Sequence, residues 1–390
     1  MPLSKDLRDQ AMMTLGDLVG FPTVTDGSNL DLIEYARAAL EPHATDVSLT
    51  YDSTAQKANL LATIGPDVDG GLVLSGHSDV VPAEEADWTA SPFLAVRREQ
   101  KVYGRGTADM KGFLACVMEM AAVYSRADLA RPIHISITYD EEVGCRGAPV
   151  LLADLEAKGR KPAAAIIGEP TDMAIVTSHK GCYEYTTVIT GLEGHGSMPG
   201  QAVNAVQYAT RYVSHLMELA AELRERVPDG SPYAPPETTI SVGTIAGGTA
   251  RNIVAGECRI EWEMRPVVRA DASFVLDRIA SVEEEIMAEM SSVSPDATVE
   301  TVTEGAVDGL EDSANNPAFE ILSEILGDHS RQVASFGTEA GLFQLAGIPA
   351  VVCGPGSIDV AHRPDEHIGL DQIERCLDML GGLIPYLQNT

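Results

Sequence analysis

LVLSGHSD, at residues 72–79, is a run of apolar residues that ends in a histidine and an aspartate. Three other short apolar runs have the same character: IHISITY (133–139), AAAIIG (163–168) and PAVVCG (349–354). Apolar runs of this length are typical of strands buried on both faces of a parallel sheet. A helical stretch from about Asp109 to Arg126 lies between the first two runs. This alternation predicts an α/β domain with a mostly parallel sheet.

Residues 179–304 have a different pattern. Two helical stretches, 202–226 and 270–290, are interspersed with strand-like runs at 182–190, 238–245, 252–265 and 297–303. The resulting order, β-α-β-β-α-β, is that of ferredoxin-like domains. The α/β pattern then resumes, with helices expected at 315–326 and 370–388. We therefore predict one α/β domain, residues 1–178 and 305–390, that is interrupted by a ferredoxin-like α+β domain, residues 179–304.

The composition narrows the class of protein. Among 390 residues, 58 are acidic and 27 are basic, which gives a formal net charge of −31, and 45% are hydrophobic. This hydrophobic fraction is sufficient for a core and excludes a disordered chain. The acidity argues against a nucleic-acid partner and against an anionic membrane, because both require basic patches.

The chain also lacks the usual marks of export. The N-terminal stretch has no apolar segment of the kind found in signal peptides, and no apolar run is long enough to predict a membrane-spanning helix. The six cysteines are scattered and form no CxxC pair, which favours buried, reduced thiols. We expect a cytoplasmic protein that does not associate with membranes.

Histidine and carboxylate side chains lie at or just after the ends of the predicted strands: His77, Asp79, Glu141, Glu142, Glu169 and His362, with Asp109 in the glycine-rich GRGTADMKG. In open α/β sheets, ligands bind beyond the carboxyl ends of the strands. Imidazole and carboxylate groups suit zinc, cobalt or manganese, and a carboxylate can bridge two ions. Taken singly, an acidic residue at a strand end is often a helix cap. A metal site accounts for the whole set together.

Five segments carry a resemblance to a known family: SGHSDVVP (75–82), YGRGTADMKG (103–112), YDEEVGCRGA (139–148), IGEPT (167–171) and AHRPDEHI (361–368). In this order they resemble the aminoacylase/carboxypeptidase family of di-zinc metallopeptidases. The resemblance implies a zinc-peptidase-like catalytic domain with an inserted lid and dimerisation domain. Within the family, the motifs are most similar to those of acetylornithine deacetylases.

The resemblance implies a role for each residue of the set. It implies two divalent metal ions, zinc with cobalt able to substitute, and a bridging Asp109. His77 and Glu169 would complete one ion, and Glu142 and His362 the other. Asp79 would orient the imidazole of His77, and Glu141 would be the general base. The resemblance further implies a cis peptide bond between Asp109 and Met110.

The resemblance also implies a reaction: hydrolysis of N2-acetyl-L-ornithine, a small acylated amino acid, to L-ornithine and acetate in arginine biosynthesis. Two alternatives within the family are a succinyl-diaminopimelate desuccinylase and a broader aminoacylase. A remote alternative from another class is a non-catalytic binding module. The intact set of ligands together with Glu141 argues against that alternative.

Four further residues are candidates for substrate contact. His195, in GLEGHGSMPG, is either an ordinary loop histidine or, by resemblance, a residue that reaches the partner's active site in a homodimer and stabilises the oxyanion. The resemblance also implies that Asn252 and Arg265 contact the substrate α-carboxylate; the alternative is an ordinary strand end for Asn252 and a surface salt bridge for Arg265. Glu339, in FGTEAG, either binds the substrate ammonium or caps a helix that begins near Ala340.

Overall fold

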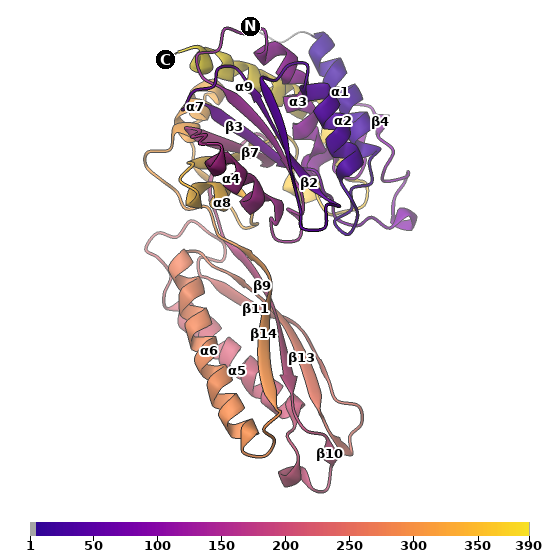
Figure 1. The fold of residues 1–390 in the computed structure, drawn as a ribbon, viewed down its shortest axis with the longest axis vertical. Coiled ribbons are helices and arrows are strands. Elements are labelled where there is room, and N and C mark those ends of the chain that lie inside the picture. Colours follow the sequence, from indigo (N-terminus) through magenta and orange to yellow (C-terminus); the bar gives the residue numbers. More distant parts are fainter. Residues whose placement is uncertain (1–4, 390) are drawn as a thin grey trace. The chain divides into compact units, whose positions relative to one another are not determined.

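The computed structural model describes residues 5–389 and forms two compact units. Unit 1 comprises the residues up to Ser178, Leu310–Gln332 and the residues from Thr338 onward, and unit 2 comprises His179–Gly309 and Val333–Gly337 (Figure 1). The return to unit 1 falls at Leu310 rather than at residue 305, because the last strand of unit 2 continues to Val307. The sequence prediction also has no counterpart for the short segment Val333–Gly337 of unit 2.

Unit 1 is built on an eight-stranded sheet with the order β1-β2-β6-β3-β7-β16-β8-β15. At its centre, β3 pairs in parallel with β6 and β7, and β7 pairs in parallel with β16. Antiparallel pairs lie to either side, between β1 and β2, β2 and β6, and β16 and β8. The strands are β1 (Asp46–Tyr51), β2 (Ala58–Ile64), β3 (Leu72–His77), β6 (Ile133–Thr138), β7 (Ala164–Pro170), β8 (Val176–His179), β15 (Gln332–Ala334) and β16 (Ala350–Gly354). The boundary between the units falls within β15, after Gln332, and within β8, before His179.

Helices cover both faces of this sheet (Figure 1). Five of them pack on one face and contribute to the largest hydrophobic core: α1 (Lys5–Val19), α2 (Leu30–Leu40), α3 (Gly112–Tyr124), α7 (Pro317–Leu326) and α9 (Leu370–Gln388). The other face carries α4 (Gly147–Ala157) and α8 (Ala340–Leu345). A sheet covered on both faces requires strands without a polar side, and β2, β3, β6 and β16 are buried throughout. The α/β prediction is confirmed.

A small three-stranded sheet supports one edge of unit 1. Its order is β17-β5-β4, with β4 at Val96–Arg98, β5 at Lys101–Tyr103 and β17 at His367–Gly369. An irregular turn at Thr107–Lys111 follows β5 and leads directly into α3. The small sheet therefore brings together two segments that are far apart in the sequence.

Unit 2 has an antiparallel sheet with the order β11-β13-β9-β14 and two helices on one face. Its elements are β9 (Cys182–Thr190), α5 (Ala205–Arg224), β11 (Thr239–Gly247), β13 (Glu257–Arg265), α6 (Arg269–Ser291) and β14 (Thr298–Val307). This order confirms the ferredoxin-like pattern. The run 252–265, expected as one strand, is divided, because Ile253–Val254 (β12) pairs with Gly194–His195 (β10).

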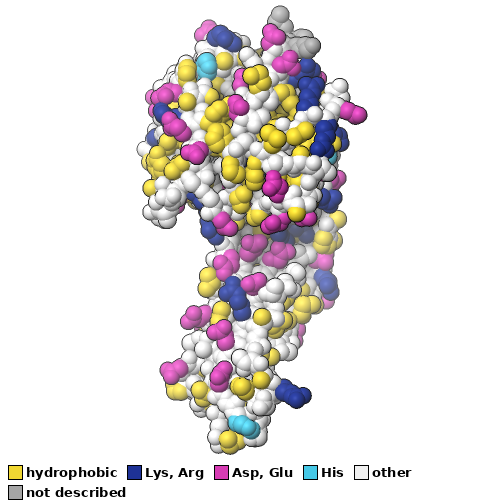
Figure 2. Space-filling model, turned by 90° about the vertical axis from the view of Figure 1, so that its right-hand side faces the viewer, with side chains coloured by type: hydrophobic (Ala, Val, Ile, Leu, Met, Phe, Trp, Pro, Cys, Tyr) yellow, Lys and Arg dark blue, Asp and Glu magenta, His cyan; other side chains and the backbone are white. Residues whose placement is uncertain are grey.

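The surface agrees with the acidic composition. On the face shown in Figure 2, carboxylate side chains are spread over each unit. Within residues 5–389, no helix is long and apolar enough to cross a membrane. All six cysteines carry free thiols.

Candidate metal centre

The centre of the large sheet positions the candidate residues. The strands β6, β3, β7 and β16 are parallel neighbours, so their carboxyl ends meet at one edge. Each strand end or the loop after it supplies part of the set: His77 ends β3, Glu169 lies near the end of β7, Glu141 and Glu142 follow β6, and His362 follows β16.

Asp109 lies at the middle of this set. Its Oδ1 is 3.0 Å from His77 Nε2, and its Oδ2 is 3.3 Å from His362 Nε2. On the first side, His77 Nε2 is also 3.6 Å from Glu169 Oε1. On the second side, His362 Nε2 is 3.0 Å from Glu142 Oε2. The structure thus brings the five predicted ligands together in two groups that share one carboxylate.

The backbone around two of these residues has special geometry. The peptide bond between Asp109 and Met110 is cis, as the resemblance implied. Gly168, directly before Glu169, leaves room for the ring of Phe113, because a Cβ at this glycine would lie 2.1 Å from that ring. Helix α3 can therefore pack closely against β7 beside the site.

The chemistry of the donor atoms fits divalent metal ions. The ligand atoms of His77, Asp109 and Glu142 lie within 4.8 Å of one another, and so do those of His77, Glu141 and Glu169. Glu169 Oε1 is buried and has no hydrogen-bond partner among the described residues. A buried polar atom without a partner is costly, and a cation coordinated by this oxygen would remove that cost. Oxygen and imidazole donors without thiolates suit zinc, cobalt or manganese.

The protonation equilibria show how crowded the negative charges are. Burial and the charge of Asp109 raise the pKa of Glu142 to about 7 and that of Glu169 to about 8. Hydrogen bonds with Asp109 and Glu142 raise the pKa of His362 to about 10. Burial opposes the charged form of His77, but the charge of Glu169 and the hydrogen bond with Asp109 raise its pKa well above the usual value. Protons bound to these groups reduce the repulsion among the buried carboxylates, as a bound cation would.

Glu141 lies beside the two groups. Its carboxylate is near the imidazole of His77 and the carboxylate of Glu169, and its Oε1 is 3.4 Å from the thiol of Cys145. Burial first, and then the charge of Glu169, raise its pKa well above the usual range. A carboxylate in such surroundings is a stronger base than a solvated one.

Asp79 differs in detail from the prediction. The acceptor for His77 Nδ1 is the backbone carbonyl of Asp79, at 2.9 Å, while the nearer carboxylate oxygen is 3.6 Å away. The carboxylate instead accepts hydrogen bonds from the backbone N–H groups of Glu141 and Glu142, both at 3.1 Å. Asp79 therefore holds the segment with the candidate base and orients His77 through its main chain.

Helix α8 begins at Ala340, directly after Glu339, as the capping interpretation expects, but the side chain of Glu339 is directed elsewhere. Its side chain is 1% exposed and makes no capping hydrogen bond to α8. Its two oxygens accept hydrogen bonds from Ser75 Oγ and, at 2.9 Å, from Thr138 Oγ1. Because two hydroxyl groups of the sheet already engage this carboxylate, a substrate ammonium would have to share it with them.

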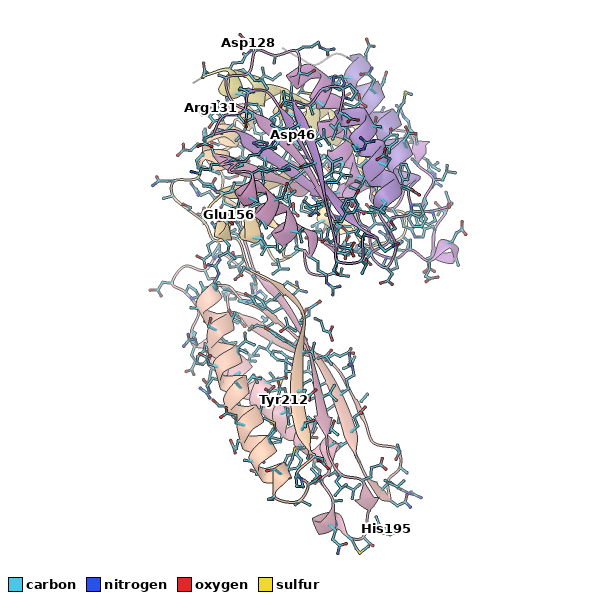
Figure 3. The ribbon with its side chains drawn as sticks, viewed as in Figure 1. Asp46, Asp128, Arg131, Glu156, His195 and Tyr212 are labelled. Carbon is cyan, nitrogen blue, oxygen red and sulfur yellow. The ribbon has the colours of Figure 1, made fainter. Side chains whose placement is uncertain are left out.

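The remaining candidates belong to unit 2. His195 lies at one end of this unit, in β10, and its Nδ1 is 2.7 Å from Ser197 Oγ (Figure 3). Asn252 is exposed, and its carbonyl accepts the N–H of Gly196 at 2.8 Å. Arg265 forms a salt bridge with Glu263 at 2.8 Å, which agrees with the interpretation of this residue as a surface salt bridge.

One buried acid escaped the sequence prediction. Glu366 is 1% exposed and binds the segment that carries Asp109. It lies four residues after His362 within AHRPDEHI, so its place in that motif was the available signal.

Comparisons with known proteins agree with this geometry. Residues 73–385 match the profile of the family described as peptidase family M20/M25/M40. An acetylornithine deacetylase of Proteus mirabilis is 34% identical over 92% of this chain and 90% of its own. Aminopeptidase PepT of Bacillus cereus has a similar structure, with a TM-score of 0.73 and 18% identity, over 98% of this chain and 99% of its own. A dinuclear metal-binding M20 peptidase of Bacillus subtilis matches with a TM-score of 0.65 and 16% identity, over 99% of this chain and 100% of its own.

Proposed function

The chain belongs to peptidase family M20/M25/M40 and is a metallo-amidohydrolase; we propose that it hydrolyses N2-acetyl-L-ornithine to L-ornithine and acetate. The observation that carries this proposal is the 34% identity to an acetylornithine deacetylase over 92% of the chain. The presence of every candidate ligand and of Glu141 beside them supports an active hydrolase rather than a binding module.

We propose that the site holds two divalent ions, with zinc as the first choice and cobalt as a substitute. His77, Glu169 and one oxygen of Asp109 would hold one ion, and His362, Glu142 and the other oxygen of Asp109 the second. This division follows the two groups of distances around Asp109. When bound, such ions polarise a carbonyl oxygen and lower the pKa of water.

The proton transfers are assigned to Glu141. Its carboxylate takes a proton from the water that adds to the acetyl carbonyl carbon, and it later delivers that proton to the α-nitrogen of ornithine as the C–N bond breaks. The products are acetate and the free α-amine, so the reaction consumes one water molecule. Asp79 keeps Glu141 in place through the N–H of that residue.

Recognition of the substrate is proposed to involve unit 2. Arg265 has the planar donor groups that suit a carboxylate, and it would exchange Glu263 for the α-carboxylate of the substrate. Asn252 is proposed as a second contact for this group. With Glu339 engaged in the sheet, we assign no residue to the side-chain ammonium.

We further propose a cytoplasmic homodimer in which His195 of one copy stabilises the oxyanion formed in the other. Six free thiols fit a reducing compartment. Mixing inactive His195→Ala subunits with inactive Glu141→Gln subunits should restore part of the activity after exchange, because one of the two sites then has both residues. An active protein that stays monomeric would exclude this arrangement.

The proposed substrate is tested with a panel of acylated amino acids and a defined supply of zinc or cobalt. We expect the highest kcat/KM with N2-acetylornithine, and the Glu141→Gln protein serves as the control for contaminating hydrolases. A clear preference for succinyl-diaminopimelate would make the protein a desuccinylase. Equal rates across many acetylated amino acids would make it a broad aminoacylase.

A further inference from the structure

Glu366 is a buried carboxylate for which the proposed reaction has no use. Every hydrogen-bond partner of its side chain is a donor: Oε1 accepts the backbone N–H of Ala108 at 2.9 Å and that of Asp109 at 3.1 Å. Oε2 accepts the backbone N–H of Gly106 at 2.9 Å and the guanidinium of Arg105 at 2.8 Å. Both oxygens therefore act as acceptors, which only a carboxylate can provide.

The partners of Glu366 form a loop that wraps around its side chain. Gly106 has a φ of 82°, a conformation that favours glycine, and it directs its N–H toward the carboxylate. The N–H groups of Gly106, Ala108 and Asp109 belong to the irregular turn before α3 and its first flanking residue, and a side chain from a distant segment accepts all three hydrogen bonds. The main chain of Glu366 is held as well, because its carbonyl accepts the N–H of Gly104 at 3.0 Å.

This loop carries the residue at the middle of the site. Glu366 accepts a hydrogen bond from the backbone N–H of Asp109. The carboxylate of Asp109 lies between His77 and His362. His362 itself is only four residues before Glu366 and has a φ of 58°. After Glu366 the chain enters β17, which pairs with β5, where His367 lies opposite Tyr103. One buried side chain thus joins the segment of the shared ligand to the segment of another ligand.

We propose that Glu366 is a positioning residue of the metal centre, which holds the Asp109 loop against the His362 loop so that Asp109 can serve both ions. The inference rests on the proposed metal centre but not on the identity of the substrate. A purely structural role would be different: the carboxylate would then stabilise the loop without any effect on the affinity for metal or on its coordination.

The test compares Glu366→Gln with Asp365→Asn. Glutamine keeps the size of the side chain but replaces one acceptor oxygen by an NH2 group. This group would face N–H donors and could not accept their hydrogen bonds. Asp365 is a matched control, because it is the adjacent acid and, among the described residues, its carboxylate accepts hydrogen bonds only from the N–H and hydroxyl groups of Thr89, at 3.0 and 2.9 Å, and none from the Asp109 loop. Both proteins are stripped of metal and reloaded with cobalt.

Three quantities are measured on each protein: the affinity for cobalt by competition with a chelator, the visible absorption spectrum of the loaded protein, and the Tm of the metal-free protein. We expect Glu366→Gln to bind the metal ~10–100-fold more weakly, as is typical when a partner of the ligands is lost. Its cobalt spectrum should change, whereas Asp365→Asn should retain the affinity and spectrum of the wild type.

Unchanged affinity and spectrum in Glu366→Gln, with only a lower Tm, would overturn the inference and leave a structural role. If Glu366→Gln does not fold, Glu366→Asp replaces it, since aspartate keeps the charge but is shorter by one methylene group; a wild-type spectrum there would also overturn the inference. A wild-type protein that binds no metal would refute both proposals. One that binds metal but does not hydrolyse acetylornithine would refute only the substrate.

Discussion

Glu141 and Glu142 are neighbours in the chain, yet their surroundings predict different roles. Glu142 Oε2 lies 3.0 Å from His362 Nε2, in the group on one side of Asp109. Glu141 is near His77 and Glu169, and no described hydrogen bond joins its carboxylate to a candidate ligand. We therefore predict that Glu141→Gln removes a base and that Glu142→Gln removes a ligand.

The expected magnitudes differ accordingly. General acid–base catalysis contributes ~10²–10⁴-fold, so Glu141→Gln should lower kcat by that factor, which corresponds to about 3–5 kcal/mol of activation free energy. Its metal content should equal that of the wild type, because both groups around Asp109 stay complete. In Glu142→Gln a neutral amide replaces a charged ligand, so we expect the affinity for one ion to fall by at least ~10-fold.

The assay separates the two effects. Each protein is equilibrated in metal-buffered solution, its metal content is measured by elemental analysis, and kcat is measured with acetylornithine at low and at high zinc. Excess zinc should restore activity in Glu142→Gln and should leave Glu141→Gln inactive. If Glu141→Gln lost an ion and recovered its turnover on reloading, the two roles would be exchanged and the assignment would be wrong.

Three further predictions follow from the same site. Carefully prepared protein should contain close to two metal ions per chain, and chelation should abolish its activity; full turnover of metal-free protein would refute the metal centre. Glu339→Gln should lower kcat/KM for acetylornithine and acetylmethionine by the same factor, because Glu339 is bonded to Ser75 and Thr138; a selective loss on acetylornithine would return it to the substrate pocket. The Tm of metal-free protein should fall as the pH rises from about 5 to 8. In the folded state the pKa values of Glu142 and Glu169 are raised to about 7 and about 8, so the unfolded chain releases these protons first and gains stability relative to the folded one. A Tm that rises across this interval in metal-free protein would contradict the prediction.

The sequence was informative where one local pattern determines a structure. The runs at 72–76 and 163–168 are mostly apolar, as buried strands require, and they appear as β3 and β7, which are buried throughout. Since parallel neighbours end at the same edge, residues that follow such runs are brought together by topology alone. This explains why the sequence alone predicts that His77 and Glu169 lie close together.

The rest depends on contacts between distant segments. The hydrogen bonds of Glu339 reach Ser75 and Thr138, which are 264 and 201 residues away in the sequence. From its neighbours alone, this residue resembles a helix cap before α8. The three-residue strands β4, β5 and β17 are likewise too short to produce a periodic pattern. The pairing of these strands can be seen only in the folded chain. The same is true of the hydrogen bonds on which the proposed role of Glu366 rests.

The same physical problem explains both the ligands and the acids around them. Carboxylates that share a buried site repel one another, so the fold must hold their segments in place by other means. It does so with three further buried acids, each of which accepts hydrogen bonds from a different part of the site. Asp79 binds the N–H groups of Glu141 and Glu142, Glu339 binds hydroxyl groups of β3 and the end of β6, and Glu366 binds the loop of Asp109. Because the acids are held in this way, a cation that enters the site would gain the full attraction of its ligands without reorganising them, and its binding should add directly to the free energy of unfolding.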